Sequence, residues 1–195
     1  MNIANFNKKK LTIDLVKANK WGLIILIPIS ILYFVPFFII WSDQFGNAEF
    51  LNNIQQFLKQ YGILAGFIPL IVLVLGIVVH ELIHGITWAI FAKQGFKSIK
   101  YGILKKMLTP YCHCKEPLRL KHYIIGAIMP AVILGFLPAI IALSIGSFSL
   151  LLFAAFFTMA AIGDFMIIQL IKNENGQSWV LDHPSEAGCY ILEEL

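Results

Sequence analysis

Long runs of apolar residues recur four times along the chain and constrain its fold more than any other feature. The runs cover about residues 21–41, 61–92, 123–145 and 148–171, and charged residues are almost absent from them. A helix needs about 20 consecutive apolar residues to cross a bilayer, and each run reaches that length. Because 58% of the 195 residues are hydrophobic and only 13% are charged, a soluble core of this size could not bury them all. We therefore predict a multi-pass membrane protein.

The connections between the runs predict how the helices are arranged. Only Gly146 and Ser147 separate the third run from the fourth, so these two helices should form an antiparallel hairpin. Residues 98–104 and 108–114 have the pattern of two short strands, which predicts a small cytoplasmic β-hairpin between the second and third helices. The expected fold class is an all-α transmembrane bundle of four helices, with this β-hairpin as a possible addition, in a single domain over residues 1–195.

The basic residues predict the orientation of the chain in the membrane. They gather in the N-terminal arm, Lys8 to Lys20, and between the second and third runs, Lys93 to Lys121, whereas residues 42–60 contain a single lysine. Basic loops stay on the cytoplasmic side, so both termini should be cytoplasmic. The net charge of +4 is then a matter of topology, and we expect no nucleic-acid partner. Apolar residues at helical spacing from Phe50 to Tyr61 predict an amphipathic helix on the outer surface.

The second run contains the pattern with the clearest chemical meaning, His80-Glu81-Leu82-Ile83-His84. Residues four apart on a helix share one face, so both imidazoles can reach a single metal ion. Glu81 lies about 100° around the helix from His80 and can accept a proton from water at the metal without ligating it. An unpaired ionisable group at the centre of a membrane helix costs about 2.5 to 3.5 kcal/mol. We predict a zinc site with His80 and His84 as ligands and Glu81 as the catalytic base.

A catalytic zinc site normally has three protein ligands and one open position, so a third ligand is required. Asp164 is the remaining ionisable residue within the four runs. It lies about 24 Å from the outer end of its helix, and the two histidines lie about 22 to 35 Å from the outer end of theirs. Because these depths overlap, Asp164 is the predicted third ligand. Residues of the loops and the tail remain as alternatives: His113, His122, Asp182 and His183.

The three cysteines do not form a disulfide framework. Cys112 and Cys114 flank His113 and resemble half of a soft metal site, but no second pair of ligands follows at the usual spacing. Together with Cys189 they fall in segments that we predict to be cytoplasmic, where thiols stay reduced. We expect three free thiols.

With these residues in hand, the chain resembles the intramembrane zinc metalloproteases of the site-2 protease type, and more closely a compact bacterial family of zincin peptidases allied to them. The resemblance rests on the segment from His80 to Gly85, the basic loop with its hairpin, Met129-Pro130 in the third run, and Asp164. It implies a bacterial plasma-membrane protein with Zn²⁺ as cofactor that cleaves a membrane-embedded substrate near the cytoplasmic face. It also implies that the hairpin pairs with the unwound substrate as an added strand.

The chain departs from the site-2 protease pattern in two places. Those enzymes have an Asn after a Gly-Pro element to stabilise the oxyanion, and residues 131–134 contain none. Their aspartate ligand precedes a glycine, whereas here Gly163 precedes Asp164. Hydrolysis of a membrane protein or peptide is the preferred prediction. Two alternatives remain open: a metal or proton carrier that uses the same ionisable residues as a relay, and a catalytically silent membrane scaffold.

Overall fold

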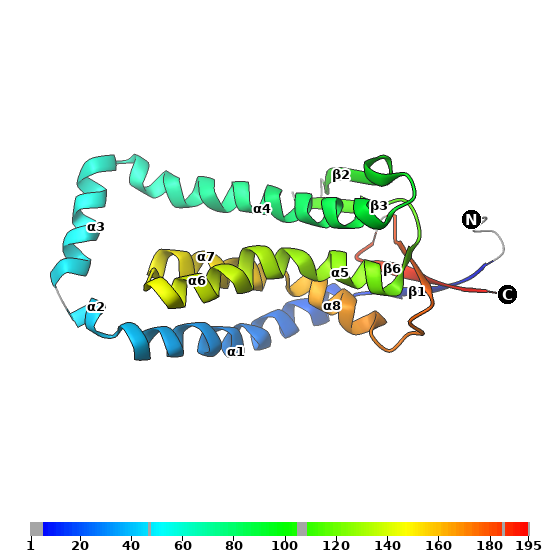
Figure 1. The fold of residues 1–195 in the computed structure, drawn as a ribbon, viewed down its shortest axis with the longest axis horizontal. Coiled ribbons are helices and arrows are strands. Elements are labelled where there is room, and N and C mark those ends of the chain that lie inside the picture. Colours follow the sequence, from blue (N-terminus) through cyan, green and yellow to red (C-terminus); the bar gives the residue numbers. More distant parts are fainter. Residues whose placement is uncertain (1–5, 47, 105–108, 185, 195) are drawn as a thin grey trace.

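The computed structural model describes residues 6–46, 48–104, 109–184 and 186–194. The molecule is elongated, with long helices running side by side along its length (Figure 1). Two small sheets lie at the end that carries both termini, and two short helices lie at the opposite end. The two ends therefore differ in structure, as expected for a protein that meets a different environment at each face of a membrane.

Within the residues described, three helices are long and apolar enough to cross a membrane. Helix α1 spans Leu15–Trp41 and α4 spans Leu64–Phe91. The third is continuous through three elements: α5 (Leu120–Pro130), the π-helical segment η3 (Ala131–Phe136) and α6 (Leu137–Ile145). These helices confirm that the first three apolar runs are long apolar helices.

The fourth apolar run forms two helices in place of one regular span. Helices α7 (Phe148–Ala160) and α8 (Ile162–Ile171) meet at a bend of 41°. The bend lies at Ala161, whose ψ of 5° takes the backbone out of the helical region. Gly163 follows at once, and glycine has low helix propensity. By length and composition, three helices in the described part of the chain could span a membrane, or four if this bent pair is one span, so the predicted four-helix bundle was wrong.

The prediction of an all-α fold was also wrong, because strands from both ends of the chain form an antiparallel sheet. The sheet has four strands in the order β1-β6-β5-β4. Their bounds are β1 Phe6–Thr12, β4 Leu118–Arg119, β5 Trp179–Asp182 and β6 Gly188–Glu194. Val180 of β5 and Cys189 and Ile191 of β6 are 0% exposed. The C-terminal segment therefore contributes β5 and β6 to a packed sheet, and His183 and Pro184 follow β5 outside the strands.

The predicted β-hairpin after α4 is present. The turn η2 (Gly95–Ser98) leads into β2 (Ile99–Leu104), which pairs with β3 (Thr109–Cys114) in antiparallel register. Leu108, where we expected the second strand to begin, lies outside the described residues. The hairpin packs closely on α4 because Gly85 has no side chain, and a Cβ there would lie 2.0 Å from the Tyr101 hydroxyl.

The first loop forms α2 (Asp43–Gly46) and α3 (Ala48–Tyr61), at the end opposite the sheets (Figure 1). Helix α3 confirms the helix expected between Phe50 and Tyr61. Its apolar side chains are exposed, including Leu51 at 62% and Leu58 at 52%. An apolar helix face without protein cover suits the surface of a bilayer.

A cluster of buried side chains at the sheet end holds the helices in place around the residues of interest. Trp88 of α4, Tyr123 of α5 and Ile171 of α8 belong to this cluster together with Val180 and Ile191 of the sheet. The cluster fixes the sheet-side ends of α4, α5 and α8 against one another. The candidate ligands lie on two of these helices, His80 and His84 on α4 and Asp164 in the first turn of α8.

Candidate metal centre

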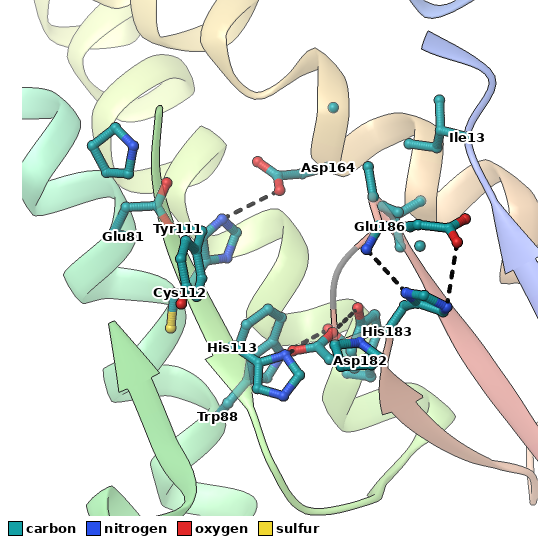
Figure 2. Close-up of a pocket in the computed structure, with 18 residues that line it drawn as sticks. Ile13, Glu81, Trp88, Tyr111, Cys112, His113, Asp164, Asp182, His183 and Glu186 are labelled. Carbon is teal, nitrogen blue, oxygen red and sulfur yellow. Dashed lines mark hydrogen bonds and ion pairs between the residues drawn. The ribbon is translucent and has the colours of Figure 1, made fainter. Parts of the chain in front are cut away.

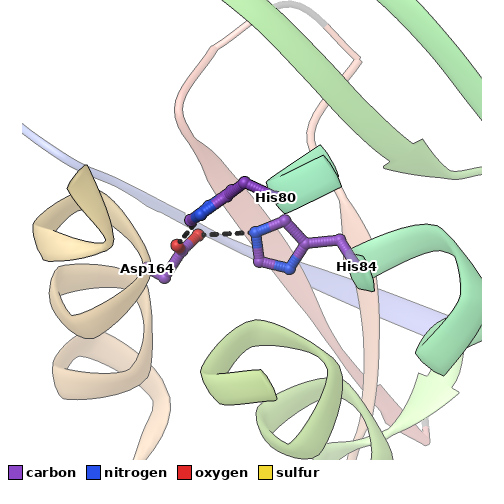
Figure 3. A group of neighbouring side chains, drawn as sticks. All are labelled: His80, His84 and Asp164. Carbon is purple, nitrogen blue, oxygen red and sulfur yellow. Dashed lines mark hydrogen bonds and ion pairs between the residues drawn. The ribbon is translucent and has the colours of Figure 1, made fainter. Parts of the chain in front are cut away.

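His80, His84 and Asp164 lie together where α4 faces α8 (Figure 3). The Nε2 atom of His80 lies 3.2 Å from Oδ2 of Asp164, and Nε2 of His84 lies 3.2 Å from Oδ1 of the same carboxylate. One ligand atom from each residue lies within 4.8 Å of the others, and no second group of this kind occurs in the described part of the chain. The structure thus brings together the three residues that the sequence suggested as ligands.

Helix α5 orients the His84 ring. The Nδ1–H of this ring donates a hydrogen bond of 2.8 Å to the Gly126 carbonyl of α5. A carbonyl oxygen can only accept, so Nδ1 carries the proton and Nε2 of the neutral ring has a free lone pair. The Trp88 indole stacks on the His84 ring, with centroids 5.1 Å apart and an interplanar angle of 16°. The ring is therefore held in the tautomer and orientation that ligation requires.

The three side chains fit a zinc ion in chemistry and in spacing. Zinc bonds to nitrogen and oxygen of about 2.0–2.2 Å in a tetrahedron place the ligand atoms about 3.3 Å apart. Here each imidazole Nε2 lies 3.2 Å from a different oxygen of Asp164, and one ligand atom from each of the three residues lies within 4.8 Å of the others. His80 and His84 are only 8% and 5% exposed. Among the described residues, Nδ1 of His80 is buried without a hydrogen-bond partner, which is uncommon in a complete polar site. Two imidazoles and one carboxylate match a catalytic zinc site with an open position.

Glu81 lies beside these residues on the wall of a cavity of about 340 Å³ (Figure 2). The wall is formed by α4, α8, β3 and the C-terminal segment, and includes Glu81, His84, Asp164, Tyr111, Cys112, His113 and Asp182. The backbone of Cys112 hydrogen-bonds the Glu81 carboxylate. The carboxylate is thus fixed next to the candidate ligands without being one of them.

Comparison with known families identifies the group of proteins to which this arrangement belongs. A family model described as "Putative zincin peptidase" matches residues 73–179, which is more than half of the chain. The chain belongs to this family. The matched segment contains all four candidate site residues, whereas α1 and the strand β6 lie outside it. No curated protein and no solved structure matches the chain. Membership of the zincin peptidase family supports a zinc peptidase, and zinc as the metal.

The alternative ligands lie outside the group of three. The His122 ring stacks on Phe91 with centroids 4.1 Å apart, and Nδ1 of His183 accepts a hydrogen bond of 2.9 Å from the Glu186 backbone. His113 faces Asp182 at 3.7 Å. His113, Asp182 and His183 nevertheless line the cavity, so the C-terminal segment does fold back over the site.

Sequence reasoning named Asp182 only as an alternative ligand and missed the contacts that let it support the site. The Tyr123 hydroxyl donates a hydrogen bond of 2.5 Å to Oδ1 of Asp182, and the Cys114 N–H donates one of 2.7 Å to Oδ2. Burial raises the pKa of the Asp182 carboxyl, and these two hydrogen bonds act against that rise. The available signal was an acidic residue among the apolar residues of a short tail segment, but nothing local indicated its partners.

The burial of two cysteines predicts slow alkylation of their thiols, which tests the packing of the sheets. Cys114 and Cys189 are 1% and 0% exposed, and burial raises the pKa of each thiol to about 12. Because only the thiolate reacts, iodoacetamide at pH 8 should alkylate both about a thousandfold more slowly in the folded protein than after denaturation. The rate should rise about tenfold per pH unit toward pH 12. Mass spectrometry of alkylated peptides measures this, and rapid labelling of either thiol in folded protein would contradict the packing.

A second prediction concerns zinc binding and rests on Gly126, where helix α5 approaches α4 closely. A Cβ on Gly126 would lie 2.0 Å from Nε1 of Trp88, so the indole would have to move away from the His84 ring on which it stacks. We expect Gly126→Ala to weaken zinc binding about 10- to 100-fold, as loss of ligand orientation usually does. Competition with a chromophoric chelator measures the affinity. Gly66→Ala is the matched control, since a Cβ there meets nothing within 4 Å.

Proposed function

We propose that the protein is a zinc-dependent intramembrane peptidase that hydrolyses a peptide bond of a membrane-associated protein or peptide near the cytoplasmic face. Membership of the zincin peptidase family supports the peptidase chemistry. The observation that carries the proposal is the position of Glu81, His84 and Asp164 on the wall of one cavity, with His80 grouped with the two ligand candidates. Two of these ligands and Glu81 stand on α4, a helix of 28 residues that is apolar enough to cross a membrane.

In this proposal His80, His84 and Asp164 hold the metal. Zinc held by these residues would supply a Lewis acid that polarises the scissile carbonyl and lowers the pKa of a water toward about 7. The hydrogen bond from Nδ1 of His84 to Gly126 keeps the opposite nitrogen available for the metal throughout the reaction. Asp164 supplies the negative charge that two neutral imidazoles lack.

Glu81 moves the proton. Its carboxylate accepts a proton from the water that attacks the carbonyl carbon, and then gives it to the nitrogen of the leaving amine as the C–N bond breaks. The hydrogen bond from the Cys112 backbone orients the carboxylate for both transfers. Water and substrate would reach Glu81 through the cavity, which is bounded by β3 and the C-terminal segment.

The proposed orientation places both termini, the β-hairpin and the four-stranded sheet in the cytoplasm. The basic residues support it, because Lys8, Lys9 and Lys10 lie on β1 and further lysines flank the hairpin. Helix α3 would then lie on the outer surface of the membrane. The cavity lies at the sheet end, so cleavage would occur near the cytoplasmic face.

Metal removal tests the proposal directly. We expect detergent-purified protein to contain about one zinc per chain and to hydrolyse fluorescein-labelled casein. Treatment with 1,10-phenanthroline should remove both the zinc and the hydrolysis, and added Zn²⁺ should restore both. Protein without zinc and without metal-dependent hydrolysis would refute the peptidase. Zinc flux into proteoliposomes in place of hydrolysis would indicate the carrier.

A further inference from the structure

Asp182 is a buried carboxylate that joins three parts of the molecule at the cavity. It is the last residue of β5 and is 8% exposed. Its Oδ1 accepts a hydrogen bond of 2.5 Å from the Tyr123 hydroxyl of α5, and its Oδ2 accepts one of 2.7 Å from the Cys114 N–H of β3. The His113 ring lies 3.7 Å from Oδ2 (Figure 2). Helix α5, the β-hairpin and the C-terminal sheet therefore meet at one side chain.

The first connection from Asp182 runs along β3 to Glu81. In an antiparallel pair, residues two apart direct their N–H groups to the same edge of the strand. The Cys114 N–H points to Asp182 and away from β2, so the Cys112 N–H points to the same free edge. There the Cys112 backbone hydrogen-bonds the Glu81 carboxylate. Asp182 thus fixes the strand that orients the proposed base.

The second connection runs through aromatic rings to His84. The Tyr123 ring stacks on the Trp88 indole with centroids 5.2 Å apart, and Nε1 of Trp88 donates a hydrogen bond of 3.1 Å to the Tyr123 carbonyl. The same indole also stacks on the His84 ring, with centroids 5.1 Å apart. By holding the Tyr123 hydroxyl, Asp182 also fixes the stack behind a proposed ligand.

We infer that Asp182 is a positioning residue for the site, holding β3 against Glu81 and the Tyr123–Trp88 stack against His84. This inference rests on the proposed function and gives the C-terminal strands a part in it. Asp182 lies beyond residue 179, the last residue of the segment that matches the zincin peptidase family. The chain therefore completes its site with a residue from outside that segment. Asp182 does not belong to the group of potential ligands, so it acts through its neighbours.

Asp182→Ala in the full chain tests the inference. With saturating zinc and fluorescein-labelled casein as the probe, we expect kcat to fall about 10- to 100-fold, the usual effect of losing an orienting group. KM should change less than about threefold, because the proposed base is displaced and the rest of the cavity wall remains. Tyr123→Phe removes only the hydroxyl, so its effect on kcat should be smaller. The double variant should be no worse than Asp182→Ala alone, since both changes break one connection.

Hydrogen exchange gives a second readout that does not depend on activity. In Asp182→Ala protein loaded with zinc, exchange should accelerate in β3 and at the start of α5 and stay unchanged in α1. Glu174→Gln is the matched control, because Glu174 pairs with Lys9 at 2.8 Å beside the same sheet and away from the cavity. This control should keep wild-type kcat and exchange.

The outcomes separate this inference from the proposed function. If wild-type protein hydrolyses casein and Asp182→Ala retains its kcat, the inference is overturned while the peptidase stands. If Asp182→Ala does not fold, Tyr123→Phe decides, and wild-type kcat in that variant overturns the inference. If wild-type protein shows no zinc-dependent hydrolysis, the proposed function fails, and local acceleration of exchange in β3 alone decides whether Asp182 holds the strand.

Discussion

Glu81→Gln protein is expected to keep its zinc and to lose peptide hydrolysis by about 10²- to 10⁴-fold, the usual contribution of a general base. Glutamine has nearly the shape of glutamate and can still accept the hydrogen bond from the Cys112 backbone. It cannot take a proton from water at neutral pH, so the fold and the ligands remain while the proton transfer is lost. Zinc content and the rate of casein hydrolysis measure the two effects separately.

The control for this variant is Glu174→Gln, the same chemical change at a surface carboxylate that pairs with Lys9. It should keep both zinc and hydrolysis. In cells, a membrane protein cleaved with wild-type protein and intact with Glu81→Gln would identify a substrate. Equal hydrolysis by wild-type and Glu81→Gln protein would remove Glu81 from the mechanism, and parallel loss of zinc would instead make Glu81 a ligand or a structural residue.

The helical part of the site could be predicted because helix geometry is local and regular. The spacing of four residues placed His80 and His84 on one face of α4, and the structure has both within reach of one carboxylate. Asp164 was chosen by depth, from the rise per residue in two helices that we predicted to enter the membrane from the same side. The bend at Ala161 did not spoil this estimate, because Asp164 lies only one turn beyond it.

The four-stranded sheet could not be predicted because its pairings are not local. Strand β1 pairs Phe6 with Glu194, near opposite ends of the chain, and β5 has only four residues. Val180 and Ile191 are both 0% exposed, but a few alternating apolar residues in a short tail are weak evidence beside four long apolar runs. The apolar runs led us to treat the remaining residues as connections, and the all-α fold class was wrong for that reason.

The supporting residues were missed for a related reason. Tyr123 opens an apolar run and reads as an interfacial aromatic residue, and its role is visible only once the C-terminal segment brings Asp182 to its hydroxyl. Gly126 contributes a carbonyl oxygen to His84, and the sequence of a helix gives no sign of which carbonyl will accept a second donor. Both roles depend on contacts between elements that only the folded chain defines.

Asp164→Asn separates the two roles that the Asp164 carboxylate could have. As a packing residue, Asp164 would serve only to accept a hydrogen bond of 3.2 Å from Nε2 of His80 and to lie 3.2 Å from Nε2 of His84, and an asparagine oxygen could replace part of that. As a ligand it supplies charge, and a neutral amide binds zinc far more weakly than a carboxylate. We expect Asp164→Asn to fold normally and to lose at least about 100-fold in zinc affinity, since a direct ligand should count for more than an orienting group.

Asp43→Asn provides the matched control for that measurement, because Asp43 lies in α2 at the far end of the molecule from the cavity. It should bind zinc as wild-type protein does. Wild-type zinc affinity in Asp164→Asn would make Asp164 a packing residue and leave the two histidines without a third ligand from α8. The cavity wall would then have to supply another, and His113 and Asp182, which already line it, would be the residues to change next. Loss of zinc with retained folding would instead support Asp164 as a ligand. The part of α8 that follows the bend at Ala161 would then bring this ligand to α4.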